Sequence, residues 1–79
     1  MVYCNHISHN KKTAKYSYGG SVDNITGVVE FSIDGSGFTI VKEPEKNASY
    51  LPAALNRLYA TALERFSGGN YPDKLSYEL

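Results

Sequence analysis

Residues 28–43 read Val-Val-Glu-Phe-Ser-Ile-Asp-Gly-Ser-Gly-Phe-Thr-Ile-Val-Lys-Glu, and this stretch decides the fold. Apolar and polar side chains alternate on both sides of residues 34–37, which is the pattern of two half-buried strands. The glycines between the two strands are typical of a tight turn. The stretch therefore predicts a β-hairpin over residues 28–42, with one apolar face.

The turn also predicts how the two strands pair. Gly35-Ser36 fits a two-residue type II′ turn, and a four-residue loop over residues 34–37 fits as well. Both connections place Ile33 opposite Phe38 and Phe31 opposite Ile40, so one register is expected from either.

An amphipathic helix is predicted after the hairpin, over about residues 50–67. Pro52 fits the first turn of a helix, where a missing N–H costs nothing. Gly68 and Gly69 are expected to end it. Apolar residues recur at helical spacing between these ends, and we expect them to pack on the apolar face of the hairpin: Leu55, Leu58, Tyr59, Ala62, Leu63 and Phe66.

The segments around this hairpin and helix are open to more than one interpretation. Residues 13–18 alternate and favour a third antiparallel strand. Residues 75–79 fit either a short strand beside the hairpin or an extended tail. Residues 1–12 fit either a strand over residues 2–7 or a poorly ordered segment. Residues 1–79 are thus predicted to form one small two-layer α+β domain. Its antiparallel sheet has three to four strands, the hairpin is central, and one helix covers it.

Composition excludes several classes of function. The chain has 79 residues, with eight basic and eight acidic side chains and one cysteine. A chain this short has little room for an enclosed pocket, and no nucleotide-binding loop is present, so neither catalysis nor a cofactor is expected. No apolar run is long enough to span a bilayer. Because there is no signal-peptide pattern and no cysteine pair, the expected location is the cytoplasm, with no membrane contact.

One cluster near the start of the chain has metal-ligand chemistry. Cys4, His6 and His9 carry the thiolate and imidazole groups that suit zinc. Three ligands within six residues match no standard structural zinc spacing, so we regard incidental histidines and cysteine in a polar segment as the simpler interpretation.

A second cluster combines cations with aromatic rings: Lys11, Lys12, Lys15, Tyr16 and Tyr18. Binders of single-stranded nucleic acid use such mixtures, with lysines along the backbone and tyrosines stacked on bases. The neutral total charge disfavours a nucleic-acid partner. A solvated lysine run entering a strand at the sheet edge explains the same residues.

A protein partner or a second copy of the chain is the leading hypothesis. One helix covers one face of the predicted sheet, which leaves the other face open for a homodimer. That face would carry Ser32, Thr39, Glu30, Val41 and Val28. Most of the seven tyrosines fall outside the hairpin and helix, and tyrosine is enriched in contact surfaces. We therefore expect a non-catalytic, self-associating interaction module, ahead of nucleic-acid binding and then metal binding.

Overall fold

A computed structural model describes residues 1–79 and contains five strands and one helix. In chain order these are β1 (Val2–His9), β2 (Thr13–Gly19), β3 (Gly27–Ser32), β4 (Phe38–Lys42), α1 (Leu51–Ser67) and β5 (Lys74–Tyr77). The strands form one antiparallel sheet in the order β4-β3-β2-β1-β5. The predicted small α+β domain is confirmed. The sheet has five strands instead of three to four, and the hairpin lies at one edge, not at the centre.

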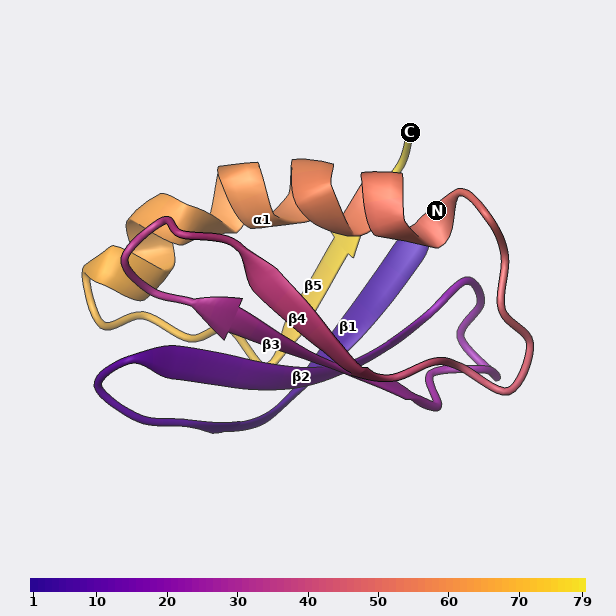
Figure 1. Cartoon of the computed structure of the whole chain (residues 1–79), viewed down its shortest axis with the longest axis horizontal. Helices are drawn as coiled ribbons and strands as arrows, with labels where there is room; N and C mark the ends of the chain where they lie inside the picture. Colours follow the sequence, from indigo (N-terminus) through magenta and orange to yellow (C-terminus); the bar gives the residue numbers. More distant parts are fainter.

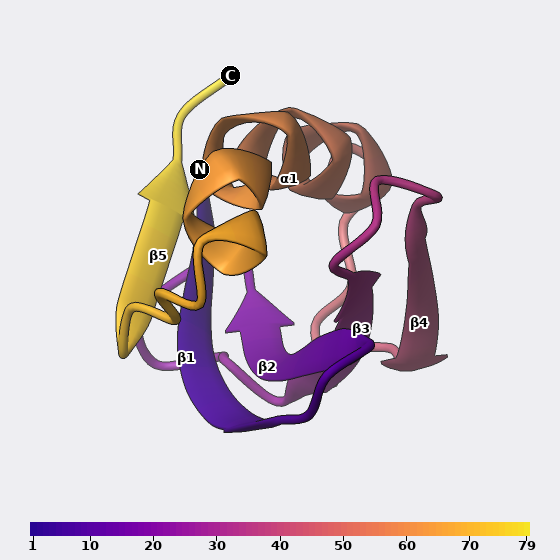
Figure 2. The same ribbon diagram turned by 90° about the vertical axis from the view of Figure 1, so that its left-hand side faces the viewer.

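The helix lies across one face of a strongly curved sheet (Figure 1). Figure 2 shows β5 and β1 rising on one side of α1, with β3 and β4 on the other side. The opposite, convex face of the sheet carries no helix. No helix in the structure has the length and the apolar content that crossing a bilayer requires.

The predicted hairpin forms as β3 and β4, but its register differs from the prediction by two residues. Phe31 lies opposite Phe38, and Val29 lies opposite Ile40. An even shift keeps the same side chains on the same face, so the apolar face is the predicted one. The predicted pairing of Ile33 with Phe38 is wrong, because residue 33 belongs to the connection instead of the strand.

Contacts from outside the hairpin explain this longer connection. The N–H of Ile33 donates to the carbonyl of Lys12, and its carbonyl accepts from the Ser67 hydroxyl. Within the connection, the Asp34 carboxylate accepts from the N–H of Ser36. Gly35 and Gly37 both adopt positive φ, at 87° and 124°, which glycine does at little cost. The β1–β2 turn and the end of the helix thus hold Ile33 away from β4.

The helix spans Leu51–Ser67, close to the predicted bounds of 50–67, with Pro52 in its first turn. Most of the predicted apolar stripe is buried, while Leu63 is only partly covered. Side chains of α1 that line the core are Leu51, Ala54, Leu55, Leu58, Tyr59, Ala62 and Phe66. The hairpin contributes Val29 and Phe31 to this core, whereas Ile33, Phe38 and Ile40 remain partly exposed.

Much of the remaining core comes from the first two strands. Val2, Cys4, Ala14, Tyr16 and Tyr18 are all buried against the helix. Of the two interpretations of the N-terminal segment, the structure has the strand, and it extends over Val2–His9. The third strand predicted over residues 13–18 is confirmed as β2.

The C-terminal strand β5 is also present, but at a different place from the one expected. It pairs with β1, with Val2 opposite Tyr77, and lies at the sheet edge farthest from β4. The expectation of a strand beside the hairpin is therefore wrong. Leu75 of β5 faces the core, and its burial against β1 accounts for the choice of neighbour.

Candidate histidine site and interaction surface

The two histidines of the chain lie side by side because β1 contains a bulge. His6 lies opposite Tyr16 and Ser8 lies opposite Lys15, which leaves Ile7 as an extra residue in the pairing. In a regular strand, residues three apart point to opposite faces. The extra residue cancels this alternation, and bulges often re-aim a side chain in this way. His9 therefore lies opposite Ala14, on the same face as His6.

The imidazoles of His6 and His9 meet at hydrogen-bonding distance. Nε2 of His6 lies 3.0 Å from Nδ1 of His9. The His9 ring stacks on Tyr71, with ring centroids 3.8 Å apart and planes 12° from parallel. The His6 ring meets the edge of Tyr16, with centroids 5.3 Å apart. Aromatic neighbours thus support both rings at the end of the sheet near β5.

Cys4 does not join the two histidines. Its side chain is almost fully buried in the core, and burial raises the pKa of its thiol to about 12. No group of three or more His, Cys, Asp or Glu side chains in residues 1–79 is arranged to hold a metal ion. The three candidate ligands predicted from the sequence are therefore not brought together; only His6 and His9 are.

Tyr16 and Cys4 make the stability of the protein sensitive to alkaline pH. Burial, with smaller contributions from Cys4 and Asp73, raises the pKa of Tyr16 from 10.0 to about 12, and the Cys4 thiol rises from 9.0 to about 12. The unfolded chain loses these protons first, so both groups stabilise the fold fully below about pH 9. This stabilisation is lost as the pH rises from about 9 towards 12.

We expect the urea midpoint to fall between about pH 8 and about pH 11, measured by circular dichroism. Cys4→Ala removes one of these titrating groups and should make this fall shallower, even though its midpoint starts lower. A midpoint that stays constant over this range in the unmodified protein would contradict the expectation.

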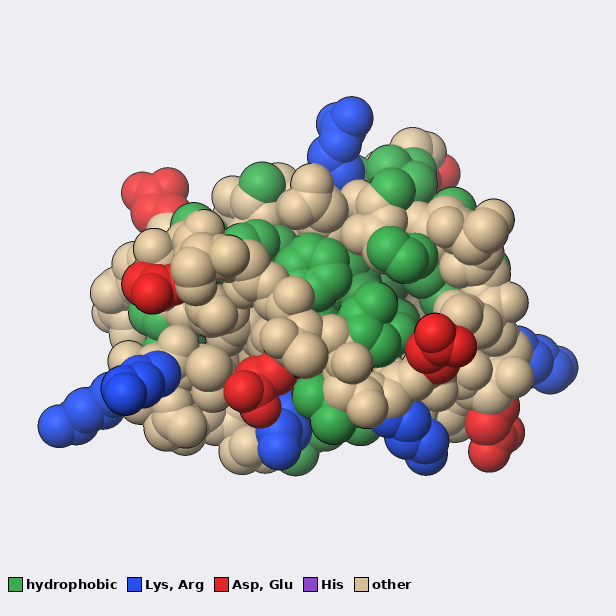
Figure 3. Space-filling view, in the orientation of Figure 1, with side chains coloured by type: hydrophobic (Ala, Val, Ile, Leu, Met, Phe, Trp, Pro, Cys, Tyr) green, Lys and Arg blue, Asp and Glu red, His purple; other side chains and the backbone are tan.

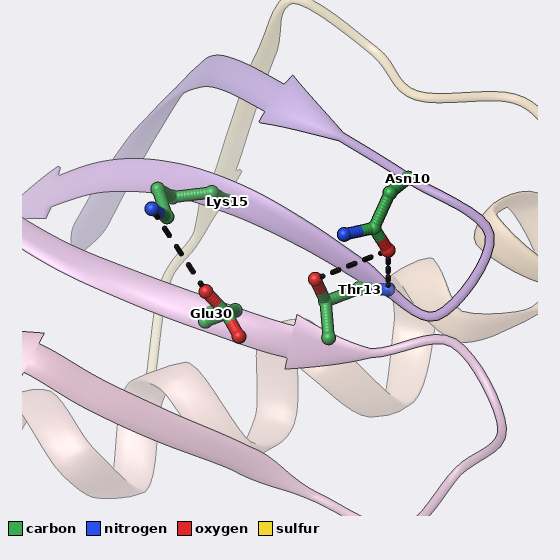
Figure 4. Close-up of polar contacts among 4 residues, drawn as sticks. All are labelled: Asn10, Thr13, Lys15 and Glu30. Atoms are coloured by element: carbon green, nitrogen blue, oxygen red, sulfur yellow. Dashed lines mark hydrogen bonds and ion pairs between the residues drawn. The ribbon is translucent and has the colours of Figure 1, made fainter.

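The lysines and tyrosines of residues 11–18 do not form one surface. Tyr16 and Tyr18 point into the core and are almost fully buried, so their rings are not free to stack on bases. Lys15 lies on the opposite, helix-free face, where its Nζ is 4.0 Å from a carboxylate oxygen of Glu30 (Figure 4). Such an exposed pair contributes little to stability.

Lys11 and Lys12 belong to the turn between β1 and β2. Figure 4 shows the side chain of Asn10 at this turn, where its oxygen accepts from the N–H of Thr13. The two lysines line a hollow of about 530 Å³ together with Asp34. The carboxylate of Asp34 places a negative charge in the same hollow, which opposes the binding of a phosphate.

The helix-free face of the sheet carries a mixture of polar and apolar side chains. Of the five residues expected on it, Thr39 and Val41 are exposed, while Val28, Glu30 and Ser32 are partly buried. Near β1 and β5, a hollow of about 400 Å³ is lined by residues that include Tyr3, Ile25 and the exposed Val22. The ion pair of Lys15 and Glu30 lies on the same face, which therefore mixes polar and apolar groups.

A second candidate surface lies where the edge strand β4 meets the helix. Figure 3 shows hydrophobic side chains at the surface in the region between α1 and β4. Phe38, Ile40 and Leu63 pack against the core there but remain partly exposed. We call these three residues the apolar strip.

The backbone of β4 is unpaired on its outer side. The N–H of Ser32 donates to the carbonyl of Gly37. Hydrogen-bonded and non-bonded pairs alternate in antiparallel strands, so Thr39 is the next residue bonded to β3. The N–H and C=O groups of Phe38 and Ile40 therefore point outward from the sheet edge.

The flank of α1 beside the apolar strip carries no charge. Tyr59 packs against Phe38, and a Leu63 methyl group lies close to Gly35 of the β3–β4 connection. Helical spacing places Pro52 and Asn56 on the same flank as Leu63. Arg57, Glu64 and Arg65 fall on other sides of the helix, so charged groups surround this flank without entering it.

Sequence reasoning identified the two histidines but not their contact, because the contact depends on the bulge at Ile7. It also assigned Phe38, Ile40 and Leu63 to the buried core, whereas they remain partly exposed. The position of the hairpin at the sheet edge was the missing information. Comparison of the chain with protein-family models, curated proteins and solved structures gives no match.

Proposed function

We propose that this protein is a non-catalytic interaction module that self-associates about a twofold axis through the edge of β4 and the apolar strip. The observation that carries this proposal is the coincidence of an unpaired strand edge with partly exposed apolar side chains. An open edge readily pairs with another strand, and proteins usually block it with charges or a covering element. Here the adjoining helix flank is uncharged.

The strip favours a second copy of the chain as the partner. In an antiparallel β4–β4 pair centred on Thr39, Phe38 of one copy faces Ile40 of the other. Both copies then extend one continuous sheet, and the interface is the same patch on each copy, as a twofold axis requires. Main-chain hydrogen bonds supply the pairing, and the apolar side chains supply the burial.

Charge also supports the antiparallel arrangement. Lys42 stands at one end of β4, and Asp34 stands in the connection before the other end, with both side chains exposed. The antiparallel pair centred on Thr39 places Lys42 of one copy opposite Ser36 of the other, in the connection that also carries Asp34, and this occurs twice in each dimer. Opposite charges at such a rim contribute to orientation more than to affinity.

Sedimentation equilibrium at several protein concentrations tests the proposal. We expect a monomer–dimer equilibrium, in which Asn56→Lys raises the dissociation constant at least tenfold by placing a charge beside the strip. Thr61→Lys is the matched control, because residue 61 is exposed on another side of the same helix. Both variants should keep the helical circular dichroism spectrum, which separates a lost interface from a lost fold.

A strict monomer at millimolar concentration would overturn the proposal. Equal weakening by Asn56→Lys and Thr61→Lys would overturn the assigned interface. Changes in the NMR chemical shifts of backbone amides on dilution give an independent test. We expect these changes at Phe38–Lys42 and none in β5.

A further inference from the structure

We propose that His6 and His9 together form a bidentate site for a divalent transition-metal ion of the Cu²⁺ or Ni²⁺ class. This site is independent of the β4 interface and lies near the other edge of the sheet. It differs from the set of candidate ligands in the sequence, because Cys4 is buried in the core and takes no part. The inference rests on the contact between the two imidazoles.

The bulge in β1 is the first step of the argument. It places two imidazoles on one face at the end of the sheet, in contact through Nε2 of His6 and Nδ1 of His9. The backbone N–H of His6 donates to the carbonyl of Asp73, which ties this part of β1 to the segment before β5. The two ligands are therefore placed by the backbone as well as by their own side chains.

The distance between the two nitrogens indicates the class of ion. Nitrogens bound to one ion at about 2.0–2.1 Å lie about 2.8–3.0 Å apart at a right angle, and about 3.3–3.4 Å apart at the tetrahedral angle. The separation here is 3.0 Å. This is a hydrogen-bonding distance, and both rings must turn before their lone pairs converge on one ion. Because the nitrogens already lie as close as a right-angle pair requires, tetragonal Cu²⁺ or Ni²⁺ coordination needs less separation of the rings than tetrahedral zinc does.

The surroundings of the pair are compatible with metal binding. His9 is exposed, and stacking on Tyr71 limits the freedom of its ring. Neither imidazole forms an ion pair with a carboxylate in the structure. On binding, the hydrogen bond between the rings breaks, each ring turns a nitrogen lone pair to the ion, and the ring that donated changes tautomer so that its proton lies on its other nitrogen. Water fills the remaining positions, because no third protein ligand is arranged there.

A copper titration followed by electron paramagnetic resonance tests the site, with the protein kept dilute. We expect one Cu²⁺ per chain and hyperfine coupling to two imidazole nitrogens. His6→Gln and His9→Gln should each weaken binding at least tenfold and leave coupling to one nitrogen. Ni²⁺ should bind more weakly than Cu²⁺, and Zn²⁺ should bind no more tightly than Ni²⁺.

A displaced histidine is the matched control. The double variant Ser8→His with His9→Gln keeps two histidines in the chain but moves one to the opposite face of β1. We expect this variant to bind copper as weakly as the single variants, with an unchanged circular dichroism spectrum. Binding as tight as that of the unmodified protein, or coupling to fewer than two imidazoles in the unmodified protein, would overturn the proposal.

Discussion

Phe31→Ala is expected to lower the free energy of unfolding by about 3–5 kcal/mol. A domain of 79 residues has a total stability of about 4–12 kcal/mol, so this single change removes a large part of it. Urea denaturation followed by circular dichroism measures the loss. A substantial unfolded fraction without denaturant is expected if the total lies near the lower limit.

The position of Phe31 explains the size of this effect. Its ring stacks on Tyr59, with centroids 5.6 Å apart and planes 7° from parallel. It also meets the rings of Tyr16, Phe38 and Phe66 at centroid distances of 5.8, 5.9 and 5.7 Å. Phe31 is therefore the centre of an aromatic cluster that joins β2, β3 and β4 to the helix.

Phe38→Ala is the matched control, because Phe38 belongs to the same cluster but is partly exposed at the sheet edge. Its loss should cost clearly less, since fewer contacts disappear and water fills the space left behind. If Phe31→Ala and Phe38→Ala destabilise the monomer equally, the cluster is not centred on Phe31.

Gly19→Ala is the second change expected to have a large effect. A Cβ atom on Gly19 would lie 1.6 Å from the carbonyl oxygen of Asn24 and 2.6 Å from its carbon. Both atoms belong to the backbone, so a small side-chain movement does not relieve the overlap. Overpacking of a core typically costs about 1–3 kcal/mol, and we expect Gly19→Ala to lower the free energy of unfolding by an amount at or above the upper end of this range.

The overlap matters because Asn24 is itself held in place. Its side chain is buried and donates to the carbonyl of Lys46, and it accepts from the hydroxyl of Thr26. If the β2–β3 loop moves to admit a methyl group, the hydrogen bonds of the buried Asn24 side chain break, and their loss is costly.

Gly68→Ala serves as the comparison at another glycine. No atom lies closer than 3.6 Å to a Cβ built there, and its φ is −85°, which any residue adopts. The free energy of unfolding should change by less than about 0.5 kcal/mol, as at ordinary surface positions. If Gly19→Ala lowers the free energy of unfolding no more than Gly68→Ala does, the close approach of residue 19 to the Asn24 carbonyl is contradicted.

The hairpin and the helix could be predicted from the sequence because their signals are local. Alternation around residues 34–37 and the helical spacing from Leu55 to Phe66 depend only on neighbouring positions. The register could not be predicted in the same way, because Ile33 is held by Lys12 and Ser67, both remote from it in sequence.

The first two strands were underestimated for a chemical reason. The sequence suggested a polar segment with incidental Cys4 and His6, and a ring at the sheet edge for Tyr16, because each of these side chains is partly polar. In the structure, Tyr16 is buried up to its hydroxyl, which donates to the carbonyl of Pro72 over 2.6 Å. A tyrosine whose one polar atom finds such an acceptor behaves as a core residue.

The pairing of β1 with β5 has a consequence for the order of folding. Val2 lies opposite Tyr77, so this contact joins nearly the two ends of the chain. During synthesis, β1, β2, β3 and β4 leave the ribosome before the strand that completes the sheet. Contacts this distant in sequence slow folding, because a long loop must close before they form. We therefore expect β1–β5 docking to be a late step, after the hairpins and the helix have assembled.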